Sequence, residues 1–329
     1  MKKALLIFSS LALVGLLFLG GLLSWSVHQF KSPGNLKEDK LVIISSGASV
    51  GAIANLLIKE GVLEVSPFIF KLGTRLYGKQ TSLQAGEYLF PAQITPYNTM
   101  MLLNSGKTHQ RHITIAEGLS RYQIAELLNN EPVLTGTIDI ENLPPEGTLL
   151  PETYNFSYGD DKNIVLNRMQ KDMKTSLSQL WEARDKNLPL KTKEEAVILA
   201  SIVEKETGIT SERARVAGVF INRLHKNMKL QSDPTTIYAL TKGMKKMERP
   251  LTYKDLRTDS PYNTYQYTGL PPNPIANPGI ESLKAVLHPE THSFLYFVAN
   301  GDGGHVFSKT LREHNKNVSK WRKLNKQKK

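Results

Sequence analysis

The sequence predicts an α+β protein that begins with a single transmembrane helix and continues into two folded parts. Three observations support this fold class: a long uncharged run follows Met1-Lys2-Lys3, a strand–turn–helix pattern occurs twice, and helical and strand patterns are mixed over the rest of the chain. The predicted boundaries are an N-terminal segment at 1–3, the transmembrane helix at 4–27, a linker at 28–40, a small α+β subdomain at 41–108, a mixed α+β domain at 109–315 and a basic tail at 316–329.

The apolar run of residues 4–27 is long enough to cross a bilayer as one helix. Lys2 and Lys3 precede it and favour a cytoplasmic N-terminus. A cleaved signal peptide is the alternative, but the run exceeds a usual signal core and no Ala-x-Ala cleavage site follows it. We therefore expect a single-pass protein of the cytoplasmic (inner) membrane, with its N-terminus inside and its folded domains on the periplasmic or extracytoplasmic side.

Composition excludes several classes of protein. The 329 residues include no cysteine, which rules out disulfides, thiolate metal sites and cysteine nucleophiles. The net charge of +12 suits an anionic partner, but export of the folded part argues against nucleic acid. Zinc-site and P-loop spacings are missing, as is the Gly-x-Ser-x-Gly elbow, so we predict no metal and no other cofactor.

An internal repeat relates residues 42–57 to residues 113–128 without gaps. Each copy has a strand pattern, a glycine turn, a serine that can cap a helix (Ser49, Ser120) and an amphipathic helix. This unit resembles the LysM module, which binds glycan. The resemblance makes the 41–108 part a LysM-like subdomain, although a purely structural role for each copy is the simpler interpretation.

The remaining elements follow from periodicity and turn residues. Helices are predicted over 66–76, 163–184, 194–208, 211–225 and 281–287, with others starting near Asp233 and Thr310; strands are predicted over 84–90, 145–154, 293–299 and 305–308. The basic tail is expected to be solvated and partly disordered. Residues 258–279 carry five prolines with aromatic and amide side chains, which fits either a sugar-binding loop or a rigid packed loop.

The helix over 194–208 is the centre of the chain. Thr192 and Glu195 can form a capping box at its start, and Gly208 can end it in the left-handed conformation. Its residues 196–203 are apolar except for Ser201, so we expect it to be buried.

Glu204 follows the most apolar part of this helix and shares a face with small residues. Burial beside apolar surface would raise the pKa of this carboxyl group and suit it to donate a proton. The alternative is a structural Glu204 that is solvated at a helix end or paired with Arg213 or Arg215. Because glycoside cleavage needs an acid that protonates the leaving oxygen, Glu204 is the best candidate acid in this sequence. Asp233 is either the N-cap of the next helix, with Pro234 at its first position, or a second acid.

A family resemblance rests on motifs that span about residues 40–316. They are residues 145–147 (Pro-Glu-Gly), 198–207 (Ile-Leu-Ala-Ser-Ile-Val-Glu-Lys-Glu-Thr), 230–235 (Leu-Gln-Ser-Asp-Pro-Thr), 260–265 (Ser-Pro-Tyr-Asn-Thr-Tyr), 269–272 (Gly-Leu-Pro-Pro), 277–279 (Asn-Pro-Gly) and 313–315 (Glu-His-Asn). In these motifs the chain resembles the endolytic murein transglycosylase (MltG, or YceG-like) family. It departs from the family at Asn273, where glycine is common, and at Glu152, where aspartate is common.

The resemblance implies a membrane-anchored lytic transglycosylase. Such an enzyme cuts β-1,4 bonds between N-acetylmuramic acid and N-acetylglucosamine inside nascent peptidoglycan strands, leaves 1,6-anhydro ends and so terminates glycan polymerisation. Glu204 would be the catalytic acid, and Gln231, Asp233, Asn263 and Tyr265 would bind or orient sugar. Peptidoglycan strands and the membrane are the implied partners, together with membrane-bound peptidoglycan synthases.

Two other functions stay open at the level of sequence. One is a two-carboxylate muramidase that uses Glu204, Asp233 and water, and it would differ in giving reducing ends. The other is a non-catalytic glycan-binding scaffold built on the repeat, which would require that Glu204→Gln change nothing.

Overall fold

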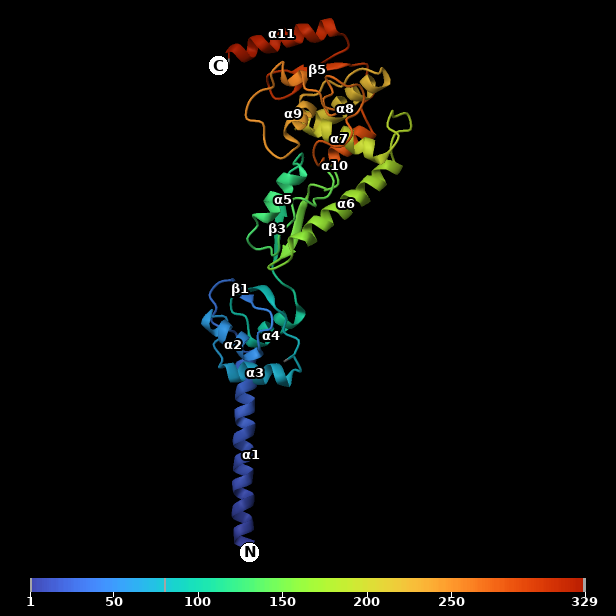
Figure 1. Ribbon diagram of the computed structural model, residues 1–329. Coiled ribbons are helices and arrows are strands. Elements are labelled where there is room, and N and C mark those ends of the chain that lie inside the picture. The colour runs from blue at the N-terminus through green and yellow to red at the C-terminus, as the bar shows by residue number, and fades with distance from the viewer. Residues whose placement is uncertain (1, 80, 328–329) are drawn as a thin grey trace. The chain divides into compact units, whose positions relative to one another are not determined.

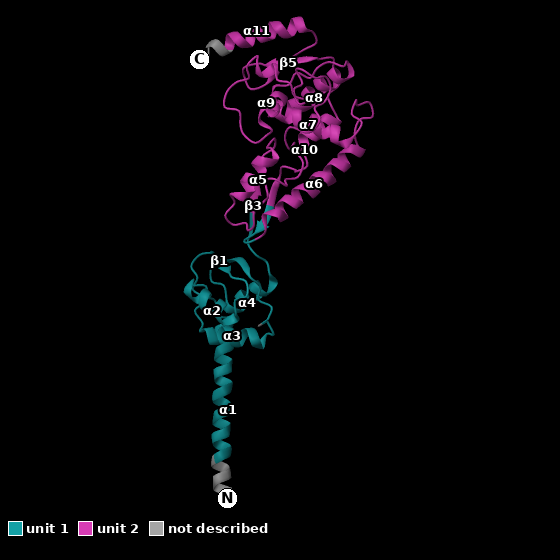
Figure 2. Ribbon diagram, in the orientation of Figure 1, with its two compact units in different colours: residues 1–111, 155–159 teal, residues 112–154, 160–329 magenta. Residues whose placement is uncertain are grey.

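The computed structural model describes residues 2–79 and 81–327 and shows a mixed α+β fold with one N-terminal apolar helix, as predicted (Figure 1). The chain divides into two compact units, which Figure 2 colours separately. Unit 1 comprises residues 1–111 and 155–159, and unit 2 comprises residues 112–154 and 160–329.

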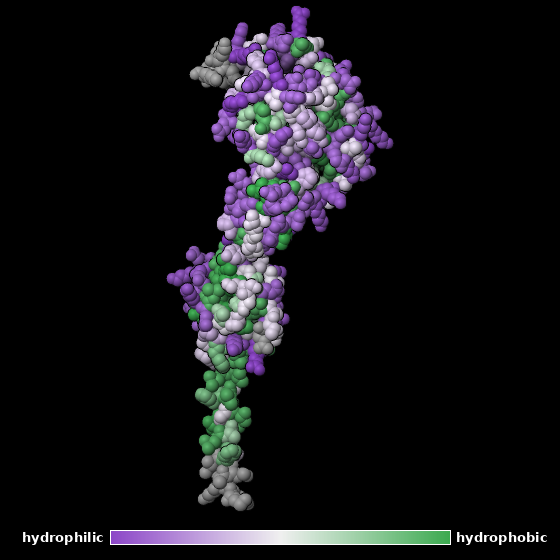
Figure 3. Space-filling model, in the orientation of Figure 1, coloured by the Kyte–Doolittle hydropathy of each residue, from purple (hydrophilic) through white to green (hydrophobic). Residues whose placement is uncertain are grey.

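Helix α1 (Lys2–Lys31) contains the predicted membrane span. Residues Phe8–Lys31 form a helix long and apolar enough to cross a bilayer, and the most apolar part of this span is not buried against the rest of the chain. Figure 3 colours most of the visible surface of its described part as hydrophobic. Among residues 8–31 the C-terminal end packs inward: Phe30 is 2% exposed and contacts the rings of Phe70, Tyr77 and Tyr97.

The folded part of unit 1 is built on a two-stranded antiparallel sheet. Its elements are β1 (Lys40–Ile44), α2 (Val50–Lys59), α3 (Pro67–Leu76), β2 (Gly86–Phe90) and α4 (Pro96–Ser105). Strand β1 pairs with β2 so that Lys40 faces Phe90 and Ile44 faces Gly86. Leu57, Phe70 and Tyr88 are fully buried between the helices and this sheet.

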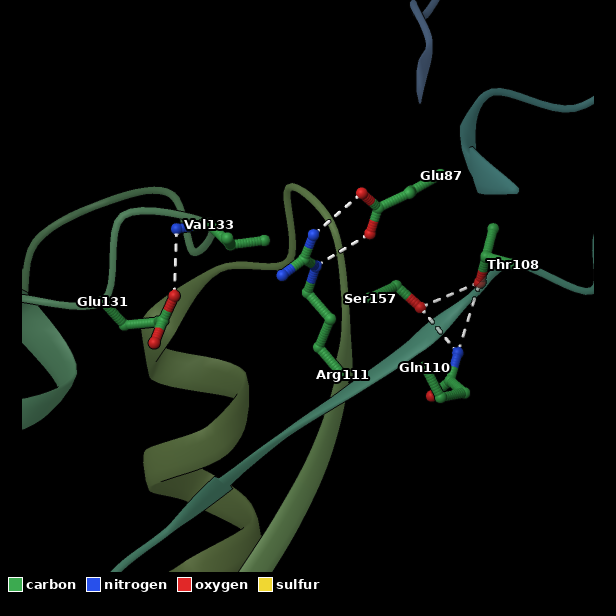
Figure 4. A network of polar contacts seen from close by, with 7 residues as sticks. All are labelled: Glu87, Thr108, Gln110, Arg111, Glu131, Val133 and Ser157. Atoms are coloured by element: carbon green, nitrogen blue, oxygen red, sulfur yellow. Dashed lines mark hydrogen bonds and ion pairs between the residues drawn. The ribbon is translucent and has the colours of Figure 1, made fainter. Parts of the chain in front are cut away.

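One buried carboxylate in unit 1 is matched by a single arginine (Figure 4). Glu87 on β2 accepts hydrogen bonds from Arg111 Nε at 2.7 Å and from Arg111 Nη2 at 2.9 Å. This two-point contact lowers the pKa of Glu87, because it stabilises the carboxylate form. Close by, Ser157 Oγ lies 3.0 Å from Thr108 Oγ1 and accepts a bond from Gln110, which ties residues 155–159 to this unit.

The second copy of the repeat has the same local structure as the first. Strand β3 (Gln110–Thr114) is followed by α5 (Arg121–Asn129), just as β1 is followed by α2. Both predicted serine caps are confirmed: Ser49 accepts a bond from the N–H of Ala52, and Ser120 forms a full capping box with Gln123. Strand β3 pairs with β4 (Thr153–Ser157), so the strand predicted over 145–154 begins only at Thr153.

Unit 2 is centred on α7 (Lys193–Glu206). Around it lie α6 (Lys162–Glu182), α8 (Thr210–His225), α9 (Asp233–Thr241), the short helix η1 (Asp255–Arg257), α10 (Ile280–Leu287), the hairpin of β5 (Tyr296–Ala299) and β6 (His305–Ser308), and α11 (Leu311–Gln327). All eight residues from Ala196 to Val203 are buried, as predicted for a helix that is apolar on every side. Helices α6, α8, α9 and α10 contact α7.

Three local predictions were wrong. Helix α7 ends at Thr207 in extended conformation, and Gly208 does not adopt a left-handed one. Thr192 caps this helix, but Glu195 accepts from the N–H of Lys191 rather than closing the box on Thr192. The basic tail is mostly exposed, as predicted, but it is helical as far as Gln327 rather than partly disordered, and α11 contacts β5 and β6; residues 328–329 lie outside the described part.

The Pro145-Glu146-Gly147 motif packs closely against α7 and the proline-rich loop at Gly147. Gly147 has a φ of +81°, and a Cβ atom there would lie 2.5 Å from Pro274 and 2.8 Å from Val197.

We expect Gly147→Ala to destabilise the protein by about 2–4 kcal/mol, because the left-handed conformation and the overpacking both add cost. Thermal unfolding will measure this loss. Gly208→Ala is the matched control, because a Cβ atom at Gly208 would have no neighbour within 4 Å and the φ of this residue is not positive; an equal loss in both variants would contradict the argument.

Candidate active site

Unit 2 contains a cavity of about 400 Å³ at the C-terminal end of α7. Residues from four helices, one strand and two loops line it: Glu206, Phe220, Arg223, Leu230, Gln231, Asp233, Tyr265, Tyr296, Phe297, Leu311, His314 and Asn315. The mixture of one candidate acid, aromatic rings and polar groups is typical of a site for a polar organic ligand.

Glu206 is the last residue of α7 and the candidate acid of this cavity. Its Oε1 accepts a hydrogen bond from Ser232 Oγ at 2.5 Å. Burial raises the pKa of Glu206 to about 7, and the nearby charge of Asp233 adds to the shift, whereas Ser232 and Arg223 oppose it. A carboxyl group with such a pKa can be protonated near neutral pH and can donate its proton to a substrate.

Three of the predicted sugar-binding residues line the same cavity as Glu206. Tyr265 donates a hydrogen bond from its hydroxyl group to Asp233 Oδ1 at 2.7 Å. Gln231 has a φ of +52°, a left-handed conformation that is strained for a residue with a side chain. Such strain is concentrated at functional sites in proteins, which is a reason to place Gln231 among the binding residues.

Asp233 does not act as the helix cap, which was one of its two predicted roles. Helix α9 begins at Asp233, its N-cap position is Ser232, and neither makes a side-chain capping bond. The carboxylate of Asp233 is therefore available to Tyr265 and to the cavity.

A basic and aromatic wall closes another side of the cavity. Arg223 donates through Nε to the carbonyl of Leu295 at 2.7 Å and through Nη1 to that of Leu230 at 2.6 Å, which fixes its guanidinium group. The guanidinium lies over the ring of Tyr296, 5.2 Å from its centroid, and His314 stacks on the same ring at 5.2 Å. Burial and the charge of Arg223 lower the pKa of His314, because both disfavour its protonated form.

Glu204, the acid predicted from the sequence, does not line this cavity. Its Oε1 accepts a bond from Arg213 Nη2 at 3.0 Å, and its Oε2 accepts one from the N–H of Gly279 at 3.0 Å. The same Arg213 atom bonds Glu117 Oε2 at 2.7 Å. Burial raises the pKa of Glu204, as predicted, but its oxygens are used to join α7 to α8 and to the start of α10. This is the structural alternative in which Glu204 pairs with Arg213.

Asn263 also lies outside the cavity lining. Its side chain is fully buried, donates to the carbonyls of Leu256 and Thr258, and accepts from Thr236. These bonds shape the loop that carries Tyr265, so Asn263 can act on the site only through that loop.

Sequence reasoning missed Glu206 and the basic wall. Glu206 projects about 200° from Glu204 around the helix, so helical spacing does not place it in a site built on Glu204. In the structure, the cavity lies on the side of the helix that carries Glu206. The sequence signal that could have identified Glu206 is the Glu-Lys-Glu motif of residues 204–206, which places two carboxyl groups on different faces of the helix. Nothing in the spacing of Arg223, Tyr296 and His314 along the chain indicates that they lie close together in the fold. Among residues 2–79 and 81–327, no group of three or more His, Cys, Asp or Glu side chains could hold a metal ion.

Comparisons with known proteins agree on one family. The chain is 34% identical to a protein named endolytic murein transglycosylase from Bacillus subtilis, over 87% of this chain and 86% of that one. It is 29% identical to a protein of the same name from Streptococcus pneumoniae, over 87% of this chain but only 59% of the longer streptococcal one. Among solved structures, it is similar to a putative yceG-like protein from Listeria monocytogenes, with a TM-score of 0.52 and 32% identity over 85% of this chain and 99% of that one. The profile of the YceG-like family matches residues 42–320, and the chain therefore belongs to the YceG-like family.

Proposed function

We propose that this protein is an endolytic lytic transglycosylase of peptidoglycan. Relatives named endolytic murein transglycosylase support this activity, as does the cavity in unit 2. The reaction breaks the β-1,4 bond between N-acetylmuramic acid and N-acetylglucosamine, forms a bond from the muramyl C6 oxygen to C1, and leaves a 1,6-anhydro end.

In this proposal Glu206 takes the role that the sequence had suggested for Glu204. Protonated Glu206 gives its proton to the glycosidic oxygen, and the resulting carboxylate then accepts the proton of the C6 hydroxyl group as that oxygen attacks C1. The observation that carries the assignment is the position of the two carboxyl groups: Glu206 faces a 400 Å³ cavity with its pKa raised to about 7, whereas Glu204 is paired with Arg213.

The other cavity residues have roles that follow from their contacts. Tyr265 and Asp233 are bonded to each other and are placed to hold sugar hydroxyl groups, and Gln231 adds an amide beside them. Tyr296 and His314, stacked on each other, and Arg223 line the same cavity and offer aromatic and cationic groups to the substrate.

Product analysis tests this function directly. Full-length protein in detergent is incubated with uncrosslinked glycan strands, and the new ends are identified by mass spectrometry. Ends lighter by one water than reducing ends would support transglycosylation. Reducing ends would instead favour a hydrolase in which Asp233, in the same cavity, activates water. An intact substrate would favour the glycan-binding scaffold.

The pH dependence of cleavage should report the acid. Since the protonated form of Glu206 is the reactive one, kcat/KM should be highest below pH 7 and fall by about tenfold per unit above it. Steady-state rates between pH 5 and 9 will measure this. A rate that rises through pH 7 would show that an ionised base, rather than an acid, limits the reaction.

We also propose that α1 anchors the protein as a single span of the cytoplasmic membrane, with its N-terminus inside. The length and apolarity of residues Phe8–Lys31 support the span, and the lysines before it support the orientation. The strand–helix–helix–strand order of unit 1, with β1 antiparallel to β2, supports a LysM-like module. Association with membrane-bound peptidoglycan synthases stays a prediction.

A further inference from the structure

Helix α3 carries apolar side chains that nothing in the described part of unit 1 covers. Phe68 is 71% exposed and Leu76 is 59% exposed, although both belong to a helix that packs into the core through Ile69 and Phe70. Phe68, Leu72 and Leu76 are spaced by four residues and so form one stripe along the helix. Exposed large apolar side chains in such a row mark an interaction surface.

The stripe lies beside the predicted membrane span. Helix α3 packs against α1 so closely that a Cβ on Gly73 would lie 2.4 Å from the ring of Phe30. Leu72 and Leu76 share a small apolar crevice with Leu23 and Val27 of α1. Figure 1 shows α3 crossing the end of α1 within this unit.

The position of the stripe along the membrane span indicates that it contacts lipid. Val27 and Leu23 precede Lys31, the end of the span, by four and eight residues, which is about 6 and 12 Å along the helix. If Lys31 lies among the headgroups, side chains beside Val27 reach the boundary between headgroups and acyl chains, which interfacial helices occupy. Lys71 and Arg75 are exposed along one edge of the stripe and can contact lipid phosphates. Lys31 itself lies 5.9 Å from the ring centroids of both Tyr77 and Tyr97, an arrangement of aromatic and basic side chains typical of a membrane interface.

We propose that α3 is a membrane-interface helix, which inserts Phe68, Leu72 and Leu76 into the bilayer that α1 crosses and thereby seats unit 1 on the lipid surface. This inference rests on the proposed anchoring by α1, but not on the proposed enzymatic activity. Its consequence is that unit 1 has a defined face toward the membrane instead of hanging from a flexible stalk.

Spin labels on single cysteines provide the test, and the absence of native cysteine makes it clean. The full chain is reconstituted in vesicles of phosphatidylcholine and phosphatidylglycerol with a label at Phe68→Cys or Leu76→Cys. Leu16→Cys, 67% exposed on α1, is the lipid reference. Leu89→Cys, 41% exposed on β2 of the same unit, is the water reference; Figure 1 shows β1, the partner strand of β2, at the end of the unit far from α1. Collision with oxygen reports lipid, and collision with a water-soluble nickel chelate reports water.

We expect labels at 68 and 76 to lose nickel accessibility severalfold relative to position 89 and to gain oxygen accessibility toward that of position 16. Nickel accessibility at 68 or 76 equal to that at 89, with position 16 in lipid, would overturn the interfacial helix and leave the anchor intact. Nickel accessibility at position 16 as well would overturn the anchor and this inference together. Glycan cleavage, measured on the same samples, reports the enzymatic proposal independently.

Discussion

Replacing Glu206 with glutamine will lower the rate of glycan cleavage by about 10²–10⁴-fold, the contribution typical of a positioned general acid. Glutamine has the size of glutamate and can still accept the hydrogen bond from Ser232, so the cavity should keep its shape. It has no carboxyl proton to give to the glycosidic oxygen. We therefore expect kcat to fall while KM changes little, as measured by release of 1,6-anhydro ends from glycan strands.

Glu204→Gln is the matched control, because both carboxyl groups lie on α7 and both have raised pKa values. An amide at position 204 keeps one oxygen for Arg213 or Gly279 but loses the charge that both donors face. We expect a cost in stability of about 1–3 kcal/mol and retention of most activity in the folded fraction. Loss of activity in a fully folded Glu204→Gln protein, with an active Glu206→Gln protein beside it, would return the catalytic role to Glu204.

The order and type of most elements were predictable because they depend on local signals. Thr192, Ser49 and Ser120 each cap a helix through a neighbour three residues away, and such contacts are encoded within one turn. The burial of α7 was also predictable from a local signal, because its residues 196–203 are apolar except for Ser201. Helix α4 was missed, although Thr95 as N-cap and Pro96 at its start carry the usual signal.

The choice between the two carboxylates could not be made from the sequence, because it depends on elements that are distant along the chain. Helix periodicity places Glu204 and Glu206 on different faces but does not say which face opens onto a cavity. Arg213 from α8 and Gly279 before α10 come to Glu204, whereas Ser232 and the β5 strand come to the side of Glu206. The sequence allowed the pairing of Glu204 with Arg213 only as an alternative, and the fold shows that this pairing forms.

Arg213→Met will destabilise the protein by about 3–5 kcal/mol, the usual cost of leaving a buried charge without its partner. The Arg213 side chain is 7% exposed and that of Glu204 is 4% exposed, so neither charge can turn to water without opening the core. Methionine fills a similar volume but leaves Glu204 and Glu117 facing each other without a cation. Urea unfolding, followed by the fluorescence of the buried Trp181 in a Trp25→Phe, Trp321→Phe background, will measure the loss.

Arg215→Met is the control for Arg213→Met, because Arg215 lies on the same helix and also pairs with a glutamate. Arg215 pairs with Glu290, but the two side chains are 41% and 39% exposed, and such a surface pair contributes less than about 1 kcal/mol. Adding Glu204→Gln to Arg213→Met should restore part of the lost stability, because it removes the unpaired charge that causes the loss. Restored stability together with retained cleavage in the double variant would establish that Glu204 and Arg213 hold α7, α8 and α10 together while the chemistry is carried out at Glu206. If Arg213→Met costs no more than Arg215→Met, the pair does not have this structural role, and the assignment of the acid to Glu206 then depends on the cavity and the raised pKa of Glu206 alone.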